Sequence, residues 1–129
     1  MLFLRFACRA VALLALTVGC NSSLEKKPFR PESVEILMPV DDVDDYANEN
    51  EFKRIVHLFA PGSEPSLDAC KNYGKYHFHG TNPKRSGDTA TAVVTVKDRQ
   101  TGNVVGEVTW TMKRIGSGWK FTDAPLPAK

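Results

Sequence analysis

Two histidines flank a phenylalanine in His77-Phe78-His79, and this spacing is the clearest candidate for chemistry in the 129-residue chain. In an extended strand, side chains two residues apart point to the same side, with Cα atoms about 7 Å apart. Imidazole is the commonest metal ligand, so the pair predicts a ligand or metal site. A third ligand would come from His57 or from an aspartate of residues 41–45. The alternative is that both histidines occupy the wetter face of an amphipathic strand.

A lone cysteine is the second candidate. Of the three cysteines, Cys8 and Cys20 belong to the N-terminal segment, so Cys70 has no partner for an intramolecular disulfide. The sequence favours a small buried side chain in a short helix over residues 65–73. The alternatives are an intermolecular disulfide, or a nucleophile beside one of the two paired histidines.

Four carboxylates occupy five positions in Asp41-Asp42-Val43-Asp44-Asp45. Their spacing fails the EF-hand pattern, which needs acids at the third and fifth places and a glycine at the sixth. Acidic residues favour the N-terminal end of a helix, so we predict a solvated helix start here. A surface calcium ion and a basic protein partner are the alternatives.

Established catalytic motifs are missing from the sequence. It contains no glycine-rich phosphate loop, no nucleophile elbow around a serine and no HExxH motif. We therefore assign no catalytic residue, no cofactor and no metal. The pattern favours a non-enzymatic role.

The first 19 residues have the layout of a secretory signal peptide. Arg5 and Arg9 form a positive start, and residues 10–18 are apolar apart from Thr17. An apolar stretch of about ten residues is too short to be a permanent membrane anchor. The sequence therefore predicts an exported protein.

The end of this leader, Leu16-Thr17-Val18-Gly19-Cys20-Asn21, resembles the lipobox of bacterial lipoproteins. The resemblance implies that Cys20 is acylated and becomes the first residue of the mature chain. It also implies that Asn21 favours sorting to the outer membrane in a two-membrane cell. Thr17 stands where that family prefers leucine, so ordinary cleavage after Gly19 is the alternative. The several lipid chains of an acylated N-terminal cysteine are sufficient to hold a neutral domain at a membrane.

A polar segment follows the leader and carries little net charge. Residues 20–32 include Pro28 and Pro31 and predict an extended tether. The chain has 17 Lys and Arg, two of them in the leader, and 15 Asp and Glu, none of them there. The mature chain is therefore formally neutral, so we expect no nucleic-acid partner.

The first half of the domain predicts a strand and two helices. Residues 33–38 alternate apolar and polar side chains, which indicates a short strand that ends at Pro39. An acidic helical turn follows, and then a main helix over residues 48–60, with apolar residues at i, i+3, i+4 and i+7 from Phe52. A second short helix covers residues 65–73, and Gly74 is placed to stop it.

The second half alternates with a period of two and predicts four strands of an antiparallel meander. The expected strands are residues 75–80, 88–97, 104–114 and 119–123, and residues 82–87 are an expected turn or loop. One face of the sheet is apolar and should pack on the main helix. The threonine-rich opposite face should be wet or line a cleft. Residues 33–127 thus form a single α+β domain.

The last strand, Gly118-Trp119-Lys120-Phe121, closes on Pro125-Leu126-Pro127, and this pattern resembles the cystatin-like and nuclear-transport-factor-2-like group. The likeness covers residues 42–127 and implies a helix packed on a curved four-stranded meander. Members of the group serve as binding modules, inhibitors and enzymes. Its enzymes place an acid or a histidine inside the cone, and no residue here matches one by position.

Together these patterns predict an exported, membrane-tethered interaction module at the cell envelope. The lipid on Cys20 would place it at the periplasmic or extracellular face of the cell membrane or the outer membrane. A protein partner or a homodimer fits this expectation. The alternative is a small-ligand carrier or an enzyme that uses a cleft on the concave sheet face, with His77, His79 and nearby aspartates.

Overall fold

A 17-residue helix, α2 (Glu32–Asn48), opens the part of the chain that the computed structural model describes, residues 31–128. The predicted strand over residues 33–38 is therefore wrong. Ile36 is 2% exposed, whereas Val34 is 45% exposed, so these two side chains do not share a buried strand face. Of the apolar residues that alternate over 33–38, Ile36 belongs to a buried stripe along one side of the helix, and this stripe continues past Pro39. The buried members of this stripe are Ile36, Pro39, Val40, Val43 and Ala47.

Pro39 lies inside α2 and is the reason that sequence reasoning divided the helix. A proline inside a helix removes one backbone hydrogen bond and usually ends or kinks the helix. Here its ring is buried in the same stripe as Val40, which is 0% exposed. Burial of the whole stripe therefore outweighs the local preference, and the acidic residues lie in the middle of the helix rather than at its start.

The predicted main helix over residues 48–60 is much shorter in the structure. Asn50 adopts a positive φ of 59°, and only α3 (Phe52–Val56) is α-helical. Residues 58–60 leave the helix and pair with the sheet: the Phe121 N–H donates to the Leu58 carbonyl at 2.9 Å, and the Ala60 N–H donates to the Phe121 carbonyl at 2.8 Å. These bonds cover an otherwise open sheet edge, which explains why the helix ends early.

The second short helix is confirmed in outline. It is α4 (Leu67–Lys71), and the Ser66 hydroxyl caps it by accepting the Ala69 N–H at 3.1 Å. The chain then continues as a 3₁₀ turn, η2 (Asn72–Lys75). Gly74 lies within this turn and does not stop the helix as predicted. A Cβ there would lie 3.0 Å from the Phe52 ring, so close packing explains the glycine.

The four-stranded antiparallel meander is confirmed. Its strands are β1 (Tyr76–Ser86), β2 (Thr89–Asp98), β3 (Val104–Ile115) and β4 (Gly118–Asp123), in the order β1-β2-β3-β4. The loop predicted over residues 82–87 is instead strand through Ser86, with a shift of register between Thr81 and Lys84. The chain turns at Gly87, whose φ is +61°.

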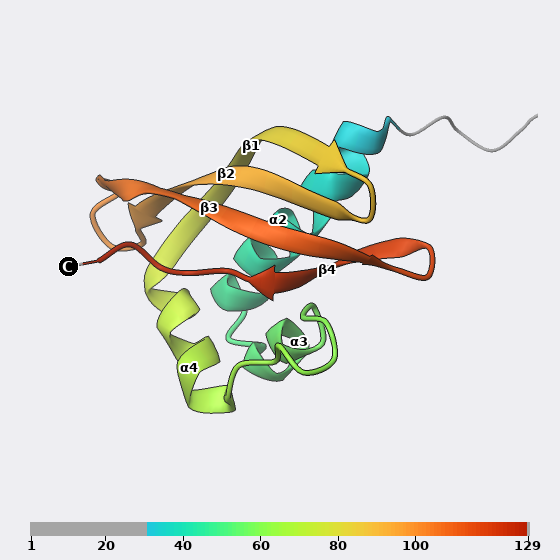
Figure 1. Cartoon of the computed structure of the whole chain (residues 1–129). Coiled ribbons are helices and arrows are strands. Elements are labelled where there is room, and N and C mark those ends of the chain that lie inside the picture. The colour runs from blue at the N-terminus through green and yellow to red at the C-terminus, as the bar shows by residue number, and fades with distance from the viewer. Residues whose placement is uncertain (1–30, 129) are drawn as a thin grey trace, which may run out of the picture. The chain divides into compact units, whose positions relative to one another are not determined.

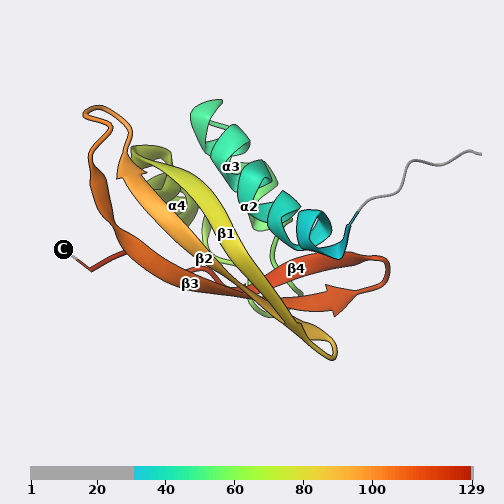
Figure 2. The ribbon, with the colours of Figure 1, turned by 90° about the horizontal axis from the view of Figure 1, so that it is seen from above.

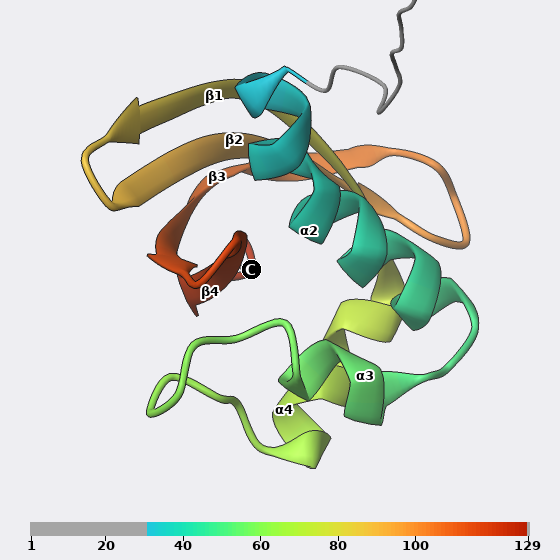
Figure 3. The ribbon, with the colours of Figure 1, turned by 90° about the vertical axis from the view of Figure 1, so that its right-hand side faces the viewer.

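All helices of residues 31–128 lie on one side of the sheet. The sheet curves around α2 (Figure 3), and α2 crosses its inner face (Figures 1 and 2). The core between them includes the buried rings of Trp110 and Phe121, with centroids 5.3 Å apart, and that of Phe78, 5.2 Å from Trp110. The predicted apolar face of the sheet is thus confirmed, although α2 takes the place of the predicted main helix.

The predicted signal peptide, Cys20 and residues 20–30 of the predicted tether lie outside the described residues. Within residues 31–128, no helix has the length and apolar character needed to cross a membrane.

Candidate functional site

The paired histidines lie on the face of β1 that points away from the core. Phe78 between them is buried, His79 is exposed and His77 is half-buried, so the two imidazoles share one side of the strand as the spacing predicted. His77 lies opposite Lys97 on β2, and His79 lies opposite Thr95. Together with Phe78, these side chains line a hollow of about 500 Å³.

Asp44 of α2 fixes His77 and also closes the outer edge of β1. One carboxylate oxygen accepts the Phe78 backbone N–H at 3.0 Å and lies 3.2 Å from His77 Nδ1. Phe78 is on an edge strand, so its N–H has no partner in the sheet and needs one from elsewhere. Asp44 therefore has a structural task as well as a place beside the imidazole.

Arg99 clamps four elements together next to the same histidine. Its guanidinium donates to the carbonyls of Gly74 at 3.0 Å and Tyr76 at 2.6 Å, and to Asn48 Oδ1 at 2.6 Å. One guanidinium nitrogen also lies 3.3 Å from both ring nitrogens of His77. Because its donors are used on the protein, Arg99 positions the His77 ring and is not a free anion ligand.

The structure does not assemble the predicted metal ligands. His57 follows α3, and its carbonyl accepts a hydrogen bond from Lys120 of β4 at 2.8 Å. Strands β4 and β1 are opposite edges of the sheet, so His57 is remote from the paired histidines. Among residues 31–128, no three His, Cys, Asp or Glu side chains lie close enough to hold a metal ion together. The hollow instead offers imidazole, ammonium and hydroxyl groups, which suit an acidic or hydroxylated ligand.

The acidic run is spread around the exposed side of α2. Burial, together with the neighbouring carboxylates, raises the pKa of Asp41 and Asp42 above its ordinary value, and His79 partly offsets this effect at Asp41. A raised pKa means that the surroundings disfavour the charged form. Asp41 and Asp42 therefore carry a local electrostatic cost in the middle of α2, and the predicted helix start stabilised by acids is wrong.

Cys70 is buried, in agreement with the favoured interpretation. Its side chain is 0% exposed, and burial raises the pKa of the thiol. A thiol that is both covered and protonated is a poor nucleophile and cannot reach another chain. The alternatives of an intermolecular disulfide and a catalytic thiol are therefore not supported by its surroundings.

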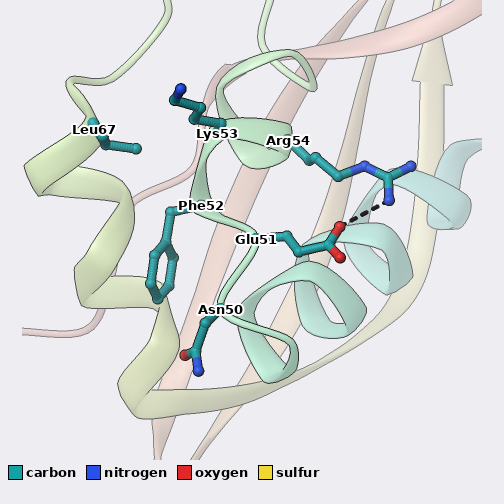
Figure 4. Close-up of a pocket in the computed structure, with 6 residues that line it drawn as sticks. All are labelled: Asn50, Glu51, Phe52, Lys53, Arg54 and Leu67. Carbon is teal, nitrogen blue, oxygen red and sulfur yellow. Dashed lines mark hydrogen bonds and ion pairs between the residues drawn. The ribbon is translucent and has the colours of Figure 1, made fainter.

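A second hollow, which sequence reasoning missed, lies between α3 and α4 (Figure 4). Its apolar walls are Phe52 and Leu67, and Leu67 is 40% exposed. Glu51 and Arg54 form an ion pair of 2.8 Å at its rim. Sequence reasoning assigned Phe52 to the core face of a long helix. The chain turns between α2 and α3 at Asn50, whose φ is positive. The sequence contains no signal strong enough to predict this turn, so that assignment stood.

The concave face of the sheet is filled by the core, so it does not hold the cleft that the alternative function required. Ile36, Val40 and Val43 of α2 are each at most 2% exposed against this face. The opposite face, which we call the outer face, is uncovered by any helix of residues 31–128 (Figures 2 and 3). It carries the threonine-rich pattern seen in the sequence, and its centre includes Thr91, Val93, Thr95, Thr109 and Thr111.

A solved structure supports the fold assignment. The chain matches a protein of unknown function with a cystatin-like fold from Nostoc punctiforme at a TM-score of 0.51 and 14% identity, over 69% of this chain and 84% of that one. The chain has a cystatin-like fold. The likeness is in the fold alone. No protein-family model matches the chain, and the comparison with curated proteins finds no match.

Proposed function

We propose that the chain is an exported interaction module, held at a membrane through a lipid on Cys20, that binds its partner through the outer face of the sheet. The observation that carries this proposal is the outer face itself. Four strands present a broad surface of short polar and β-branched side chains, with no helix of residues 31–128 over it. A wide, shallow surface suits a macromolecular partner, whereas small ligands are usually bound in concave sites.

The tether is supported by the leader and by Gly19-Cys20-Asn21, which resemble a lipoprotein signal. The site of action would be the periplasmic or extracellular face of the cell membrane or the outer membrane. Cells given an alkyne-labelled palmitate should incorporate the label into the full chain, and the protein should sediment with membranes. Cys20→Ala should abolish the label and the sedimentation that persists at high salt, and Cys8→Ala should change neither because Cys8 leaves with the leader. Label retained in Cys20→Ala would contradict the proposed anchor.

A second candidate function is the carriage of a small acidic or hydroxylated ligand. It is favoured by the hollow of about 500 Å³ that His77, His79, Thr95 and Lys97 line. Native mass spectrometry of residues 21–129, purified without denaturation, tests it. A retained small molecule that is lost in the double variant His77→Ala/His79→Ala would support a carrier. A bare chain with no adduct would contradict it.

A further inference from the structure

The outer face has an unbalanced charge. Four lysines occupy strand positions on this face: Lys84 on β1, Lys97 on β2, Lys113 on β3 and Lys120 on β4. Among the strand positions that share the face, two are acidic: Glu107, whose carboxylate lies 3.5 Å from the Thr95 hydroxyl, and the exposed Asp123, which pairs with Thr111. The face is therefore basic, although the mature chain as a whole is neutral.

Two pairs of basic residues lie directly opposite each other across neighbouring strands. Lys113 pairs with Lys120 on β4, and Lys97 pairs with His77 on β1. Like charges at directly opposite positions destabilise a sheet, and this applies to the two lysines, whereas the His77 ring lies 3.2 Å from the Asp44 carboxylate. Lys120 relieves part of this repulsion by donating to the His57 carbonyl. An external anion over the face would offset the rest.

The negative charge is gathered on the other side of the sheet. Helix α2 carries six acidic residues and no lysine or arginine. Of the 17 basic residues in the chain, five lie in residues 1–30, as does one of the 15 acidic residues, so residues 31–129 carry 12 basic and 14 acidic groups. The domain is thus net negative by two, and any attraction to an anionic surface must come from the outer face and not from total charge.

We propose that the outer face docks on an anionic lipid surface. This inference rests on the proposed function, because the tether supplies the membrane. Lysines near an anionic bilayer are each attracted appreciably, and the attraction falls off within about 10 Å. From Thr89 to Lys97, β2 spans about 27 Å, and the four lysines lie on four different strands, so they are spread over the face rather than gathered around one ligand. Val104 and Ile115, 61% and 36% exposed, place aliphatic groups at two ends of the same face.

The tether is long enough for this orientation. The chain between Cys20 and the start of α2 extends to about 40 Å at most. A helix packed on a sheet is about 20 Å thick, so an anchor attached at the start of α2 can reach a membrane on the far side of the sheet. A second copy of the chain, with its acidic α2 on the lysines, is the competing occupant. It fits less well, because Asp44 is used on Phe78 and His77.

Vesicle binding of residues 31–129 tests the proposal without the lipid anchor. We expect this part to fold by itself, since residues 31–129 form one compact unit and contain the whole core described for residues 31–128. It should sediment with vesicles of phosphatidylglycerol and phosphatidylcholine, and not with pure phosphatidylcholine. Binding should weaken strongly as salt rises from about 0.05 to 0.5 M. Lys97→Gln/Lys113→Gln should weaken binding about 25-fold, at about fivefold for each lysine.

The matched control is Lys53→Gln/Lys71→Gln, which removes the same charge from α3 and α4. This variant should change binding less than twofold, and thermal melting should show that both variants fold. An equal loss in both variants would overturn the docking face, and so would the absence of binding to anionic vesicles at low salt. A salt-sensitive dimer that excludes vesicles would assign the face to a second copy. Palmitate labelling at Cys20 is unaffected by these outcomes, so failure of this inference and failure of the anchor are distinguishable.

Discussion

At the scale of the residue, Asp44 joins the candidate site to the stability of the fold. Its carboxylate holds both the His77 ring and the Phe78 N–H at the outer edge of β1. The residue was visible in the sequence as one of four aspartates, but nothing in the run distinguishes it from its neighbours. The difference arises from the angular position on α2, which depends on a helix that the sequence pattern did not reveal.

Asp44→Ala should lower the free energy of unfolding by about 1–2 kcal/mol, because it leaves a backbone donor on the sheet edge without its partner. Asp45→Ala removes an exposed carboxylate of the same helix and should change stability by about 0.5 kcal/mol or less. Urea unfolding of the two variants measures the difference. Equal effects would show that the Phe78 N–H does not depend on Asp44.

Tyr73 makes the fold sensitive to alkaline pH. Its hydroxyl donates to the Ala124 carbonyl at 2.6 Å, and burial raises the pKa of Tyr73 above its ordinary value of 10.0. The unfolded chain ionises at the ordinary pKa while the folded chain keeps its proton, so this contribution to stability is full below pH 10 and is lost as pH rises above it. Cys70 acts in the same direction from its ordinary pKa of 9.0.

Tyr73→Phe should therefore lower stability near neutral pH by about 1–2 kcal/mol, because the buried Ala124 carbonyl loses its donor. The same variant should lose less stability than the parent chain between pH 9 and 11. Denaturant unfolding across this range gives both quantities. A variant with the same alkaline loss as the parent would show that Tyr73 does not cause it.

At the scale of the element, the approach of α2 to β1 depends on a missing side chain. A Cβ at Gly80 would lie 3.0 Å from the Leu37 Cδ2 atom and 3.3 Å from the Val40 Cβ atom. Gly80→Ala should therefore destabilise the fold by about 1–3 kcal/mol through overpacking. Gly118→Ala is the control in the same sheet, since nothing lies within 4 Å of its Cβ position. Thermal unfolding that ranks Gly118→Ala as the more damaging would contradict this packing.

The buried stripe of α2 gives the most direct test of the corrected helix. Val40 is 0% exposed and Val34 is 45% exposed, although both are valines of the same segment. Val40→Ala should cost about 2 kcal/mol of stability, through lost transfer energy and a residual cavity, whereas Val34→Ala should cost about 0.5 kcal/mol or less. If chemical denaturation gives the larger loss for Val34, the helix does not face the sheet as described.

Prediction from sequence succeeded for the sheet and failed for the helices, for physical reasons. Strands β2 and β3 alternate strictly, so the buried positions Val94 and Trp110 follow from the period alone. Helix α2 continues through Pro39 because the burial of its apolar stripe outweighs the cost of the proline. Backbone groups of residues 58–60 form hydrogen bonds with β4 and so do not continue the helix. Both outcomes depend on tertiary contacts between segments distant in the chain, which local patterns do not contain.

The same limit applied to the candidate site. The pairing of His77 with His79 on one strand face followed from the spacing, whereas the positions of Asp44 and Arg99 beside His77 depend on how α2 and the end of β2 pack. The basic outer face was hidden by the neutral total charge. Charges that alternate with core residues on four strands become a patch only when the strands are placed side by side.

At the scale of the whole molecule, the two sides of the sheet have different tasks. One side is closed by α2 and the core, and the other presents threonines and lysines without a covering helix in residues 31–128 (Figure 3). A chain anchored at its N-terminus can turn either side toward a membrane, and the charge distribution favours the outer face. We therefore expect the outer face, and not the helical side, to meet the partner.

Site-specific photo-crosslinking in the intact host tests this claim most directly. A photoreactive amino acid at Thr109 samples the centre of the outer face, and one at the exposed Asp68 of α4 samples the helical side. We expect lipid or protein adducts from Thr109 and none above background from Asp68, with both variants still sedimenting with membranes. Adducts from Asp68 and none from Thr109 would contradict it and would move the binding surface to the helices.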